Sequence, residues 1–235
     1  MKIYNMPKNI IITGAAGNLG QVVVDKLVGE GYHIIATLGP DDKPERITNE
    51  KVEPYSLDLS NETEVEGFYE KVIKDHGEIY AGILIAGGFG MGDIRESDGE
   101  ALRKMYSLNF ETAYYMARQL FTRMEKQENG GTIIFIGAKP AFTPSLSKNM
   151  LPYALSKSLL FRLAEAINAD TNETGVNASV IVPGTIDTPA NREAMPDADF
   201  SKWVSREALA DTMKFILSDT GNSLRENVIK VYNKS

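Results

Sequence analysis

Cysteine is absent from this 235-residue sequence. Its absence excludes disulfides, thiolate nucleophiles, cysteine-bound zinc and iron–sulfur clusters. Histidine is scarce, since His33 and His76 are the only two in the chain. One is expected in a strand and the other at the end of a helix, so we predict neither a histidine relay nor a metal site.

Long hydrophobic runs are also missing. Residues 1–9 are polar, and the apolar run that follows, 10–12, is too short for a signal-peptide core or a membrane span. Together with the lack of cysteine, which suits a reducing compartment, this predicts a cytoplasmic protein with no membrane partner. The net charge is −7 and no run of Lys and Arg occurs, which argues against a nucleic-acid partner.

Three glycines follow the first apolar run at three-residue spacing, Gly14, Gly17 and Gly20, and a helical pattern continues over 22–28. Glycines permit a tight turn and a close backbone approach. The start of the helix offers free N–H groups and a positive dipole end to a pyrophosphate. We therefore favour a nucleotide-binding turn over a tight turn without a ligand.

Acidic residues follow the second predicted strand, 33–38, close to where a ribose-binding acid is expected. Asp41 and Asp42 come slightly late and favour an unphosphorylated ribose, whereas Lys43 suits a 2′-phosphate. An ordinary solvated turn explains all three residues equally well. The choice between NAD and NADP is therefore open at this point.

Strand and helix patterns alternate along the whole chain. A third strand, 52–57, precedes a helix predicted to begin with Ser60 as its N-cap. A fourth strand, 80–86, is nearly continuously apolar, as in a parallel sheet that is covered on both faces. The remaining strands are predicted over 132–136, 177–182 and 227–232. Seven strands and about six helices, 43% of the residues being hydrophobic, predict an α/β single-domain doubly wound Rossmann fold with a seven-stranded parallel sheet.

A tyrosine and a lysine stand four apart in a later helical pattern and point from the same face. The ammonium of Lys157 is predicted to lower the pKa of Tyr153 from its usual value near ~10, which makes the phenol a proton donor and acceptor near neutrality. The buried side of this helix is expected to carry Leu155, Leu159, Leu163 and Ile167.

A polar residue, Asn109, lies within the apolar stripe of a long helical pattern over 99–127. A buried amide needs hydrogen-bond partners. Bonding to the backbone is its default role, and a functional role depends on its neighbours. The stripe is formed by Met105, Leu108, Ala113, Met116, Leu120 and Met124.

The notable segments all follow strands of the predicted sheet. Ligands of doubly wound sheets bind beyond the carboxyl ends of the strands, so we expect these segments to converge on one crevice. They are 14–20, Asp58, 86–90, Ala138 and 183–188.

On these residues the chain resembles the short-chain dehydrogenase/reductase family over essentially its whole length. The glycine fingerprint, the Tyr153 and Lys157 pair and the relay Asn109 all have matching positions. The resemblance implies that Tyr153, Lys157 and Asn109 are catalytic. It implies cofactor contacts at Gly14, Ala16, Asn18, Leu19, Asp58, Leu59, Ala86, Gly87, Gly88, Tyr153, Lys157, Pro183, Gly184, Ile186 and Thr188.

One departure from the family is at the end of strand five, where its catalytic serine is replaced by Ala138. Ser145 and Ser147 lie nearer the tyrosine and are candidate substitutes. Segments 85–89, 137–139 and especially 187–200 are similar to the quinonoid dihydropteridine reductase-like subgroup, which uses a Tyr/Lys pair without the serine. Asn109 and the missing acid after strand two depart from that subgroup.

The resemblance implies an NAD(P)-dependent oxidoreductase that passes a hydride to a carbonyl or a quinonoid dihydropteridine-like substrate, with Tyr153 as the proton donor. A quinonoid substrate is electron-poor and needs less oxyanion stabilisation, which fits Ala138. The alternative is a non-catalytic NAD(P)-binding sensor or scaffold on the same fold. The family also implies a homodimer or homotetramer.

The chain is expected to be one NAD(P)-binding domain over 1–235, with a substrate lid at about 185–205 that is rich in Pro, Asp and Asn. Phe200 and Trp203 in this segment are equally compatible with stacking on a planar substrate and with anchoring the lid.

Overall fold

The computed structural model describes residues 8–42, 49–224 and 227–234; the polar segment 1–7 and Lys43 lie outside these ranges. Within them the strands form one parallel sheet in the order β3-β2-β1-β4-β5-β6-β7. The strands are β1 (Asn9–Thr13), β2 (His33–Leu38), β3 (Val52–Ser56), β4 (Ala81–Leu84), β5 (Gly131–Ile136), β6 (Val176–Pro183) and β7 (Val228–Val231). The predicted α/β fold with seven parallel strands is confirmed.

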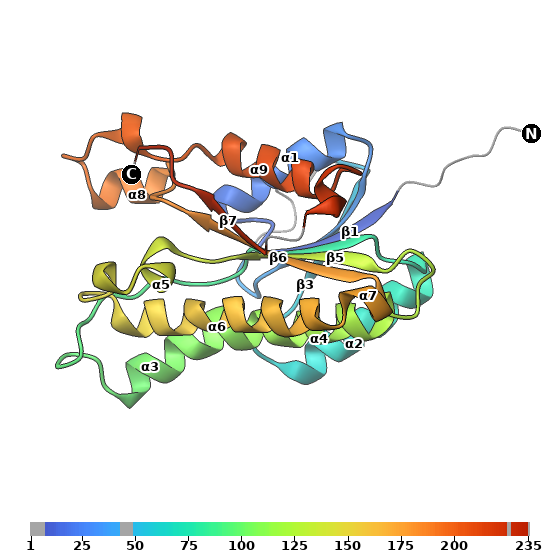
Figure 1. Ribbon diagram of the computed structural model, residues 1–235, viewed down its shortest axis with the longest axis horizontal. Helices are drawn as coiled ribbons and strands as arrows, with labels where there is room; N and C mark the ends of the chain where they lie inside the picture. The colour runs from blue at the N-terminus through green and yellow to red at the C-terminus, as the bar shows by residue number, and fades with distance from the viewer. Residues whose placement is uncertain (1–7, 43–48, 225–226, 235) are drawn as a thin grey trace, which may run out of the picture.

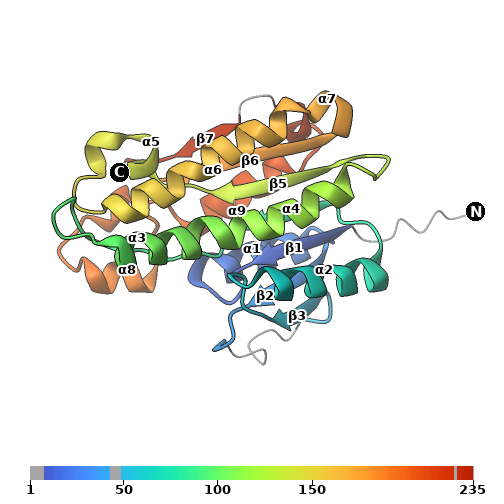
Figure 2. The same ribbon diagram turned by 90° about the horizontal axis from the view of Figure 1, so that it is seen from below.

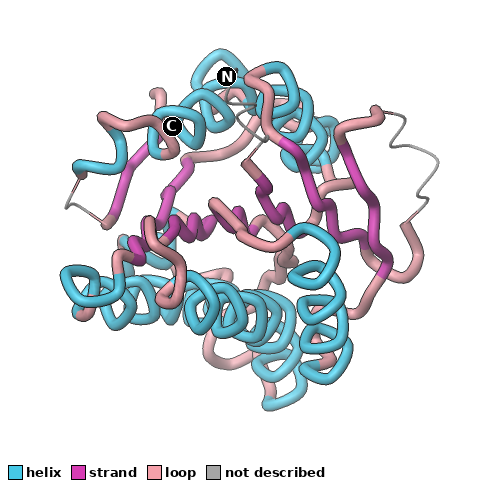
Figure 3. The backbone as a smooth tube through the Cα atoms, turned by 90° about the vertical axis from the view of Figure 1, so that its right-hand side faces the viewer, coloured by secondary structure: helices cyan, strands magenta, loops and turns pink. Residues whose placement is uncertain are grey.

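Helices cover both faces of the sheet, as the view along the strands shows (Figure 3). On one face lie α1 (Asn18–Gly29) and α9 (Arg206–Ile216), and on the other lie α2 (Glu62–His76), α4 (Thr112–Met124) and α6 (Leu151–Ala169) (Figures 1 and 2). Two hydrophobic clusters, one on each face, bury the inner strands almost completely, whereas the edge strands β3 and β7 are only partly buried. This double burial explains why the sequences of the inner strands are almost continuously apolar.

Short helices follow or precede the strands at the two ends of the sheet (Figure 1). At the carboxyl end are α3 (Gly99–Tyr106), α5 (Lys139–Phe142) and α8 (Pro189–Ala194), while α7 (Thr171–Thr174) lies at the amino end of β6. Between α3 and α4 the segment Ser107–Glu111 is π-helical, so the predicted long helix is continuous but contains a wide turn. Such turns change the direction in which side chains point and are frequent at functional sites.

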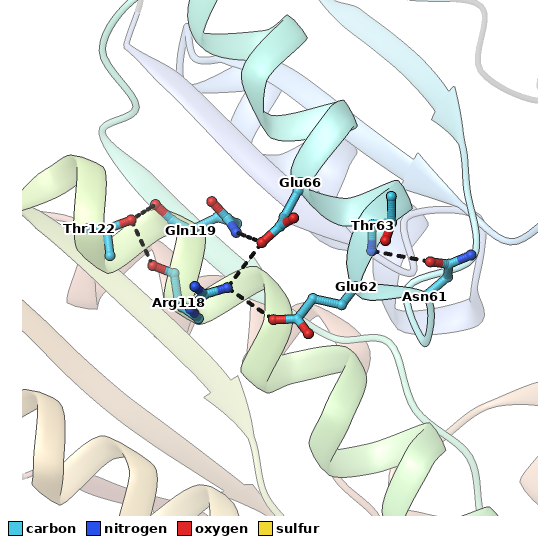
Figure 4. Close-up of polar contacts among 7 residues, drawn as sticks. All are labelled: Asn61, Glu62, Thr63, Glu66, Arg118, Gln119 and Thr122. Carbon is cyan, nitrogen blue, oxygen red and sulfur yellow. Dashed lines mark hydrogen bonds and ion pairs between the residues drawn. The ribbon is translucent and has the colours of Figure 1, made fainter.

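The N-cap of α2 is Asn61, whereas the sequence predicted Ser60. The side-chain oxygen of Asn61 accepts a hydrogen bond from the N–H of Thr63 at 3.1 Å (Figure 4). It also accepts the N–H of Glu64 at 3.4 Å. Ser60 instead donates its N–H and its hydroxyl to Oδ1 of Asp58, at 2.8 and 2.7 Å. Because the Asp58 carboxylate holds Ser60 in the preceding turn, the helix begins one residue later.

Polar contacts join α2 to α4 on the outer surface (Figure 4). Arg118 contacts Glu62 at 2.9 Å and Glu66 at 3.1 Å, and all three side chains are about half exposed. Ion pairs at such exposure contribute little to stability. The two helices are held mainly by the apolar cluster beneath them, to which α2 contributes Val65 and Val72.

The orientation of α6 differs from the prediction. Leu155 is 48% exposed and Leu159 and Leu163 are only partly buried, whereas Ile167 is buried as predicted. The buried side contains Ala154, Lys157, Leu160, Phe161 and Ala164. Since Lys157 points inward, its neighbours three and four positions away point inward with it, and the leucines are rotated toward the surface. Leu108 of the Asn109 stripe is likewise exposed, because it borders the crevice described below.

Across the described ranges, we find no helix whose length and apolar character would let it span a bilayer.

Candidate active site

A crevice of about 430 Å³ lies beyond the carboxyl ends of β1 to β4. It brings together three of the segments that the sequence predicted to converge: the glycine turn, Asp58-Leu59 and the residues after β4. Of the predicted cofactor contacts, the crevice is lined by Gly14, Asn18, Leu19, Asp58, Leu59, Ala86 and Gly87. A second cavity, of about 160 Å³, lies at the opposite end of the sheet among asparagines that include Asn168 and Asn177.

The glycine turn fits closely against the end of β4. Gly14 has a φ of +66°, and a Cβ there would lie 3.0 Å from the backbone nitrogen of Ala86. A Cβ on Gly20 would lie 2.2 Å from the carbonyl oxygen of Gly14. The hydroxyl of Thr13 accepts the N–H of Ala86 at 3.2 Å, which ties the two strands together. Glycine is therefore required at both positions, for conformation at one and for space at the other.

The N-terminus of α1 opens into this crevice. Its N-cap is Gly17, and no described side chain caps the first turn. Free N–H groups and the helix dipole attract an anion, and no acidic residue of the first turn opposes this. The residues present therefore fit the pyrophosphate of a dinucleotide.

At the end of β2 the carboxylate of Asp42 borders the same crevice. Its Oδ2 accepts the N–H of Gly39 at 2.8 Å, which holds the side chain next to the strand end. Of the two predicted acids, Asp42 rather than Asp41 lines the crevice. Lys43, the candidate for a 2′-phosphate, lies outside the described residues.

Asn109 is completely buried between two elements of the site. Its Oδ1 accepts the N–H of Gly88 at 3.0 Å, and its Nδ2 donates to Oγ of Ser156 at 3.1 Å. Ser156 in turn donates to the carbonyl oxygen of Tyr153 at 2.8 Å. The amide therefore joins the loop after β4 to the first turns of α6. The expected hydrogen bond from Asn109 to the backbone is therefore present, at Gly88, and the same amide is linked through Ser156 to the helix that carries Tyr153 and Lys157.

Lys157 is buried beside this amide, with 5% of its surface exposed. Its Nζ donates to the carbonyl oxygen of Ile136, at the end of β5, at 2.9 Å. Gly87 fills the narrow space between the two polar side chains. A Cβ at Gly87 would lie 2.6 Å from Oδ1 of Asn109 and 3.1 Å from Nζ of Lys157.

Burial determines the proton affinities of the predicted pair. Desolvation raises the pKa of Tyr153 to about 12 and lowers the pKa of Lys157 to about 8. The predicted lowering of the Tyr153 pKa by Lys157 is therefore wrong for this structure. The cause is desolvation of the phenol, and Nζ of Lys157 donates to the Ile136 carbonyl oxygen. The phenol is consequently protonated near neutrality and able to donate.

No hydroxyl stands at the end of β5, because Ala138 is buried there as the N-cap of α5. Ser145 belongs to the 3-10 turn Pro144–Leu146 and is exposed. The hydroxyl of Ser147 donates to the carbonyl oxygen of Pro144 at 2.7 Å, within the same turn. The substitution of either serine for the missing one stays a prediction.

An aromatic ring that the sequence did not single out stands beside the phenol. Phe89 is 61% exposed, and its ring meets that of Tyr153 edge to face, with centroids 5.0 Å apart. The loop that carries it is tied to α6, because Leu151 N–H donates to Gly92 O at 2.9 Å and Gly92 N–H donates to Asn149 O at 2.8 Å. Met91, two residues further along the same loop, is also exposed. The sequence signals were its place in a glycine-rich loop and in segment 85–89, which resembles the dihydropteridine reductase-like subgroup, but no role was predicted for the ring.

The segment predicted as a lid folds back on itself after β6. Asp187 N–H donates to Val204 O at 2.8 Å, and the Thr188 hydroxyl caps α8 by accepting the Asn191 N–H at 3.1 Å. Arg192 forms a two-pronged pair with the Asp187 carboxylate, at 2.6 and 2.8 Å. Pro183, Gly184 and Ile186 lie at the start of this segment, at the carboxyl end of β6.

Of the two readings for the aromatic residues of this segment, the structure favours anchoring. Trp203 is 7% exposed, and its ring contacts that of Phe200 with centroids 4.7 Å apart. The guanidinium of Arg192 lies 4.7 Å from the Phe200 ring centroid. The Asn233 amide donates to the Trp203 carbonyl oxygen at 2.7 Å. These contacts hold both rings against the protein itself.

The chain is similar in sequence and in fold to known proteins. The sequence profile of the family described as short chain dehydrogenase matches residues 8–199. An uncharacterized oxidoreductase of Staphylococcus saprophyticus is 27% identical over 210 residues, covering 86% of this chain and 85% of that protein. The uncharacterized oxidoreductase YuxG of Bacillus subtilis is 26% identical over 191 residues, which cover 76% of this chain but only 27% of that longer protein. A solved structure titled "ElxO with NADP Bound" superposes with a TM-score of 0.88 at 20% identity, covering 96% of this chain and 97% of the other, and shows the same fold.

Proposed function

This chain belongs to the short-chain dehydrogenase family and is an NAD(P)-dependent oxidoreductase of it, and from that premise we propose that it reduces a carbonyl or quinonoid dihydropteridine-like substrate, with Tyr153 as the proton donor. The observation that carries this proposal is the hydrogen-bonded assembly of the buried Asn109 and Ser156 with the backbone of Tyr153, beside Lys157, which is bonded to the end of β5, next to a crevice that suits a dinucleotide.

The cofactor is assigned to the crevice by the groups that line it. The N-terminus of α1 would hold the pyrophosphate, Asp58 and Leu59 the adenine, and Asp42 the adjacent ribose. The segment that begins at Pro183 would hold the nicotinamide end, near Lys157. When bound, the nicotinamide supplies or accepts the hydride.

The protein's own residues position the substrate and move the proton. The raised pKa of Tyr153 keeps the phenol protonated, so that its hydroxyl donates to the substrate oxygen or nitrogen as the hydride arrives. Lys157 provides a positive charge that is more favourable beside the resulting phenolate than beside the phenol. Asn109 keeps the first turns of α6 in register with the Gly88 loop, which orients both groups.

A planar, electron-poor substrate is supported by two features of the site. The exposed ring of Phe89 offers a face beside the Tyr153 phenol, on which a flat heterocycle can stack. Ala138 offers no hydroxyl to stabilise an oxyanion, and a quinonoid ring needs such help least. Both features favour a quinonoid dihydropteridine-like substrate over a simple ketone.

The variant Tyr153→Phe tests this function, with Tyr32→Phe, which alters a partly buried tyrosine just before β2 and away from the crevice, as the matched control. Turnover is followed through the absorbance of NADH or NADPH, first with quinonoid dihydropterin and then with a panel of carbonyl compounds. We expect Tyr153→Phe to lose roughly 10²–10⁴-fold in kcat while retaining cofactor affinity, and the control to retain both.

If the enzyme reduces carbonyl compounds but not quinonoid dihydropterin, the proposed catalytic mechanism stands and the pterin substrate is refuted. Cofactor binding without turnover of either class would favour the alternative, a non-catalytic sensor or scaffold. Retention of wild-type turnover by Tyr153→Phe would refute the role of this residue.

We also propose that the chain forms a homodimer or homotetramer through α4 and α6. The rings of Tyr106, Phe110 and Tyr114 form a row along the long helix, with successive centroids 5.3 and 5.8 Å apart, and Tyr106 and Tyr114 are partly exposed. Leu155 is exposed on α6. Sedimentation analysis of wild type and of Leu155→Glu tests this proposal: a loss of the oligomer in the variant supports it, and a monomeric wild type contradicts it.

A further inference from the structure

The two histidines of the chain lie together with a glutamate at the end of the sheet where its strands begin. His33 is the first residue of β2, Glu53 lies in β3 and His76 ends α2. The crevice lies at the opposite end of the strands, beyond their carboxyl ends. The length of β2, at about 3.3 Å per residue, separates the two sites by roughly 16 Å. This cluster therefore plays no part in the proposed reduction.

The nitrogen and oxygen atoms of the cluster converge. One potential ligand atom from each of the three side chains lies within 4.8 Å of the other two. Nε2 of His76 lies 3.0 Å from Oε2 of Glu53. That nitrogen is buried, yet within the described part of the chain it makes no hydrogen bond. The two imidazole rings are 5.1 Å apart and tilted by 38°, so they do not stack face to face.

The tautomer of His33 follows from its neighbour Asn9. The Asn9 amide nitrogen donates to the carbonyl oxygens of His76 (3.2 Å) and Glu78 (3.0 Å), which fixes the orientation of the amide. Its Oδ1 therefore faces Nδ1 of His33, at 3.1 Å, and can only accept. The proton of a neutral His33 is placed on Nδ1, and Nε2 is left with a lone pair. An oxygen that orients a histidine in this way is typical of metal ligands.

Glu53 is oriented in a similar manner. Its Oε1 accepts the hydroxyl of Tyr55, while its Oε2 faces His76. The His76 side chain is 17% exposed and that of Glu53 is 41% exposed, so water reaches the cluster from one side.

We propose that His33, Glu53 and His76 bind a divalent transition-metal ion of the zinc type, with water as the fourth ligand. Two histidines and one carboxylate are a known ligand set for tetrahedral zinc. At metal–ligand distances of about 2.0–2.2 Å, tetrahedral ligand atoms are about 3.4 Å apart. The pair at 3.0 Å is close to this spacing, and no separation in the cluster exceeds 4.8 Å, so relative side-chain movements of about 1.4 Å or less bring the three ligand atoms together.

The sequence prediction that excluded a histidine metal site is revised by this placement. Residues 33, 53 and 76 form no local spacing motif, and parallel pairing of β2 with β3 brings the first two together. A bound ion would join β2, β3 and the end of α2. Its role is therefore to stabilise this edge of the nucleotide-binding half.

Zinc titration of protein that carries no affinity tag tests the site, with the imidazole nitrogen signals of ¹⁵N-labelled protein as the readout. Because the chain contains only two histidines, only two sets of signals are present. We expect both sets to change together and to saturate at one zinc per chain. We also expect the midpoint of thermal unfolding to rise by about 5–10 °C at a hundredfold excess over the dissociation constant.

Glu53→Gln and His76→Gln are the test variants, and Glu66→Gln, on the outer face of α2, is the matched control. The first two should lose both responses, and the control should keep them. Asn9→Ala should weaken zinc binding about 10–100-fold without abolishing it. The proposal is overturned if zinc leaves both imidazoles unchanged, if only one responds, or if Glu53→Gln binds as tightly as wild type.

Discussion

Replacing Gly87 by alanine places one methyl group at the most crowded point of the active site. The backbone there has no positive φ, so alanine is conformationally allowed and the cost is steric. The new Cβ would lie 2.6 Å from Oδ1 of Asn109, whereas ordinary contacts begin at 3.4 Å. The amide oxygen must therefore retreat by about 0.8 Å.

That retreat breaks a buried hydrogen bond. The distance from Oδ1 of Asn109 to the nitrogen of Gly88 is 3.0 Å, and a further movement of this size takes it beyond bonding range. The lost bond costs about 1–2 kcal/mol, and overpacking adds about 1–3 kcal/mol. We expect the unfolding free energy of Gly87→Ala to fall by about 2–5 kcal/mol, and kcat to fall about hundredfold because the Tyr153 helix is displaced.

A double-mutant cycle separates this mechanism from a general loss of stability. Asn109→Ala removes the atom with which the methyl group collides, so Gly87→Ala should cost much less in that background, with a coupling of about 2 kcal/mol. Urea unfolding and steady-state kinetics of the four proteins measure the cycle. Equal costs in both backgrounds would refute the reasoning.

Four further predictions test other parts of the structure. Gly67→Ala lies on the exposed face of α2 with nothing within 4 Å of the new Cβ, and should stabilise the protein by about 0.5–1 kcal/mol in urea unfolding. Asn61→Ala should cost about 1 kcal/mol as the loss of an N-cap, and a larger cost for Ser60→Ala would contradict the assignment. Burial lowers the pKa of Lys157 to about 8, so between pH 8 and the unfolded pKa of 10.5 the unfolded chain binds more protons than the folded chain. The unfolding free energy should therefore rise by up to about 3 kcal/mol as the pH increases across this window. Lys157→Met should abolish this rise. Asp42→Ala should lower KM for NADPH relative to NADH, because a carboxylate at the ribose repels a 2′-phosphate; an unchanged ratio of the two KM values would place the ribose elsewhere.

Much of the fold was predictable because its signals are local. The apolar runs, the glycine spacing after β1 and the alternation of strands and helices each depend on a few consecutive residues, and the structure contains all seven predicted strands. The pairing of Tyr153 with Lys157 on one helix also follows from helical periodicity alone. The position of Asn109 beside them did not follow from periodicity, and was inferred from family resemblance.

The sequence by itself determined the sheet, its two helical layers and the segments that meet at its carboxyl edge, since covalent spacing and side-chain periodicity encode them. Only the tertiary structure decided which way α6 faces, why Asn61 rather than Ser60 caps α2, and that burial raises the Tyr153 pKa. It also brought His33 and His76 together. These features depend on desolvation and on contacts between atoms far apart in the chain, and no local pattern of residues records either.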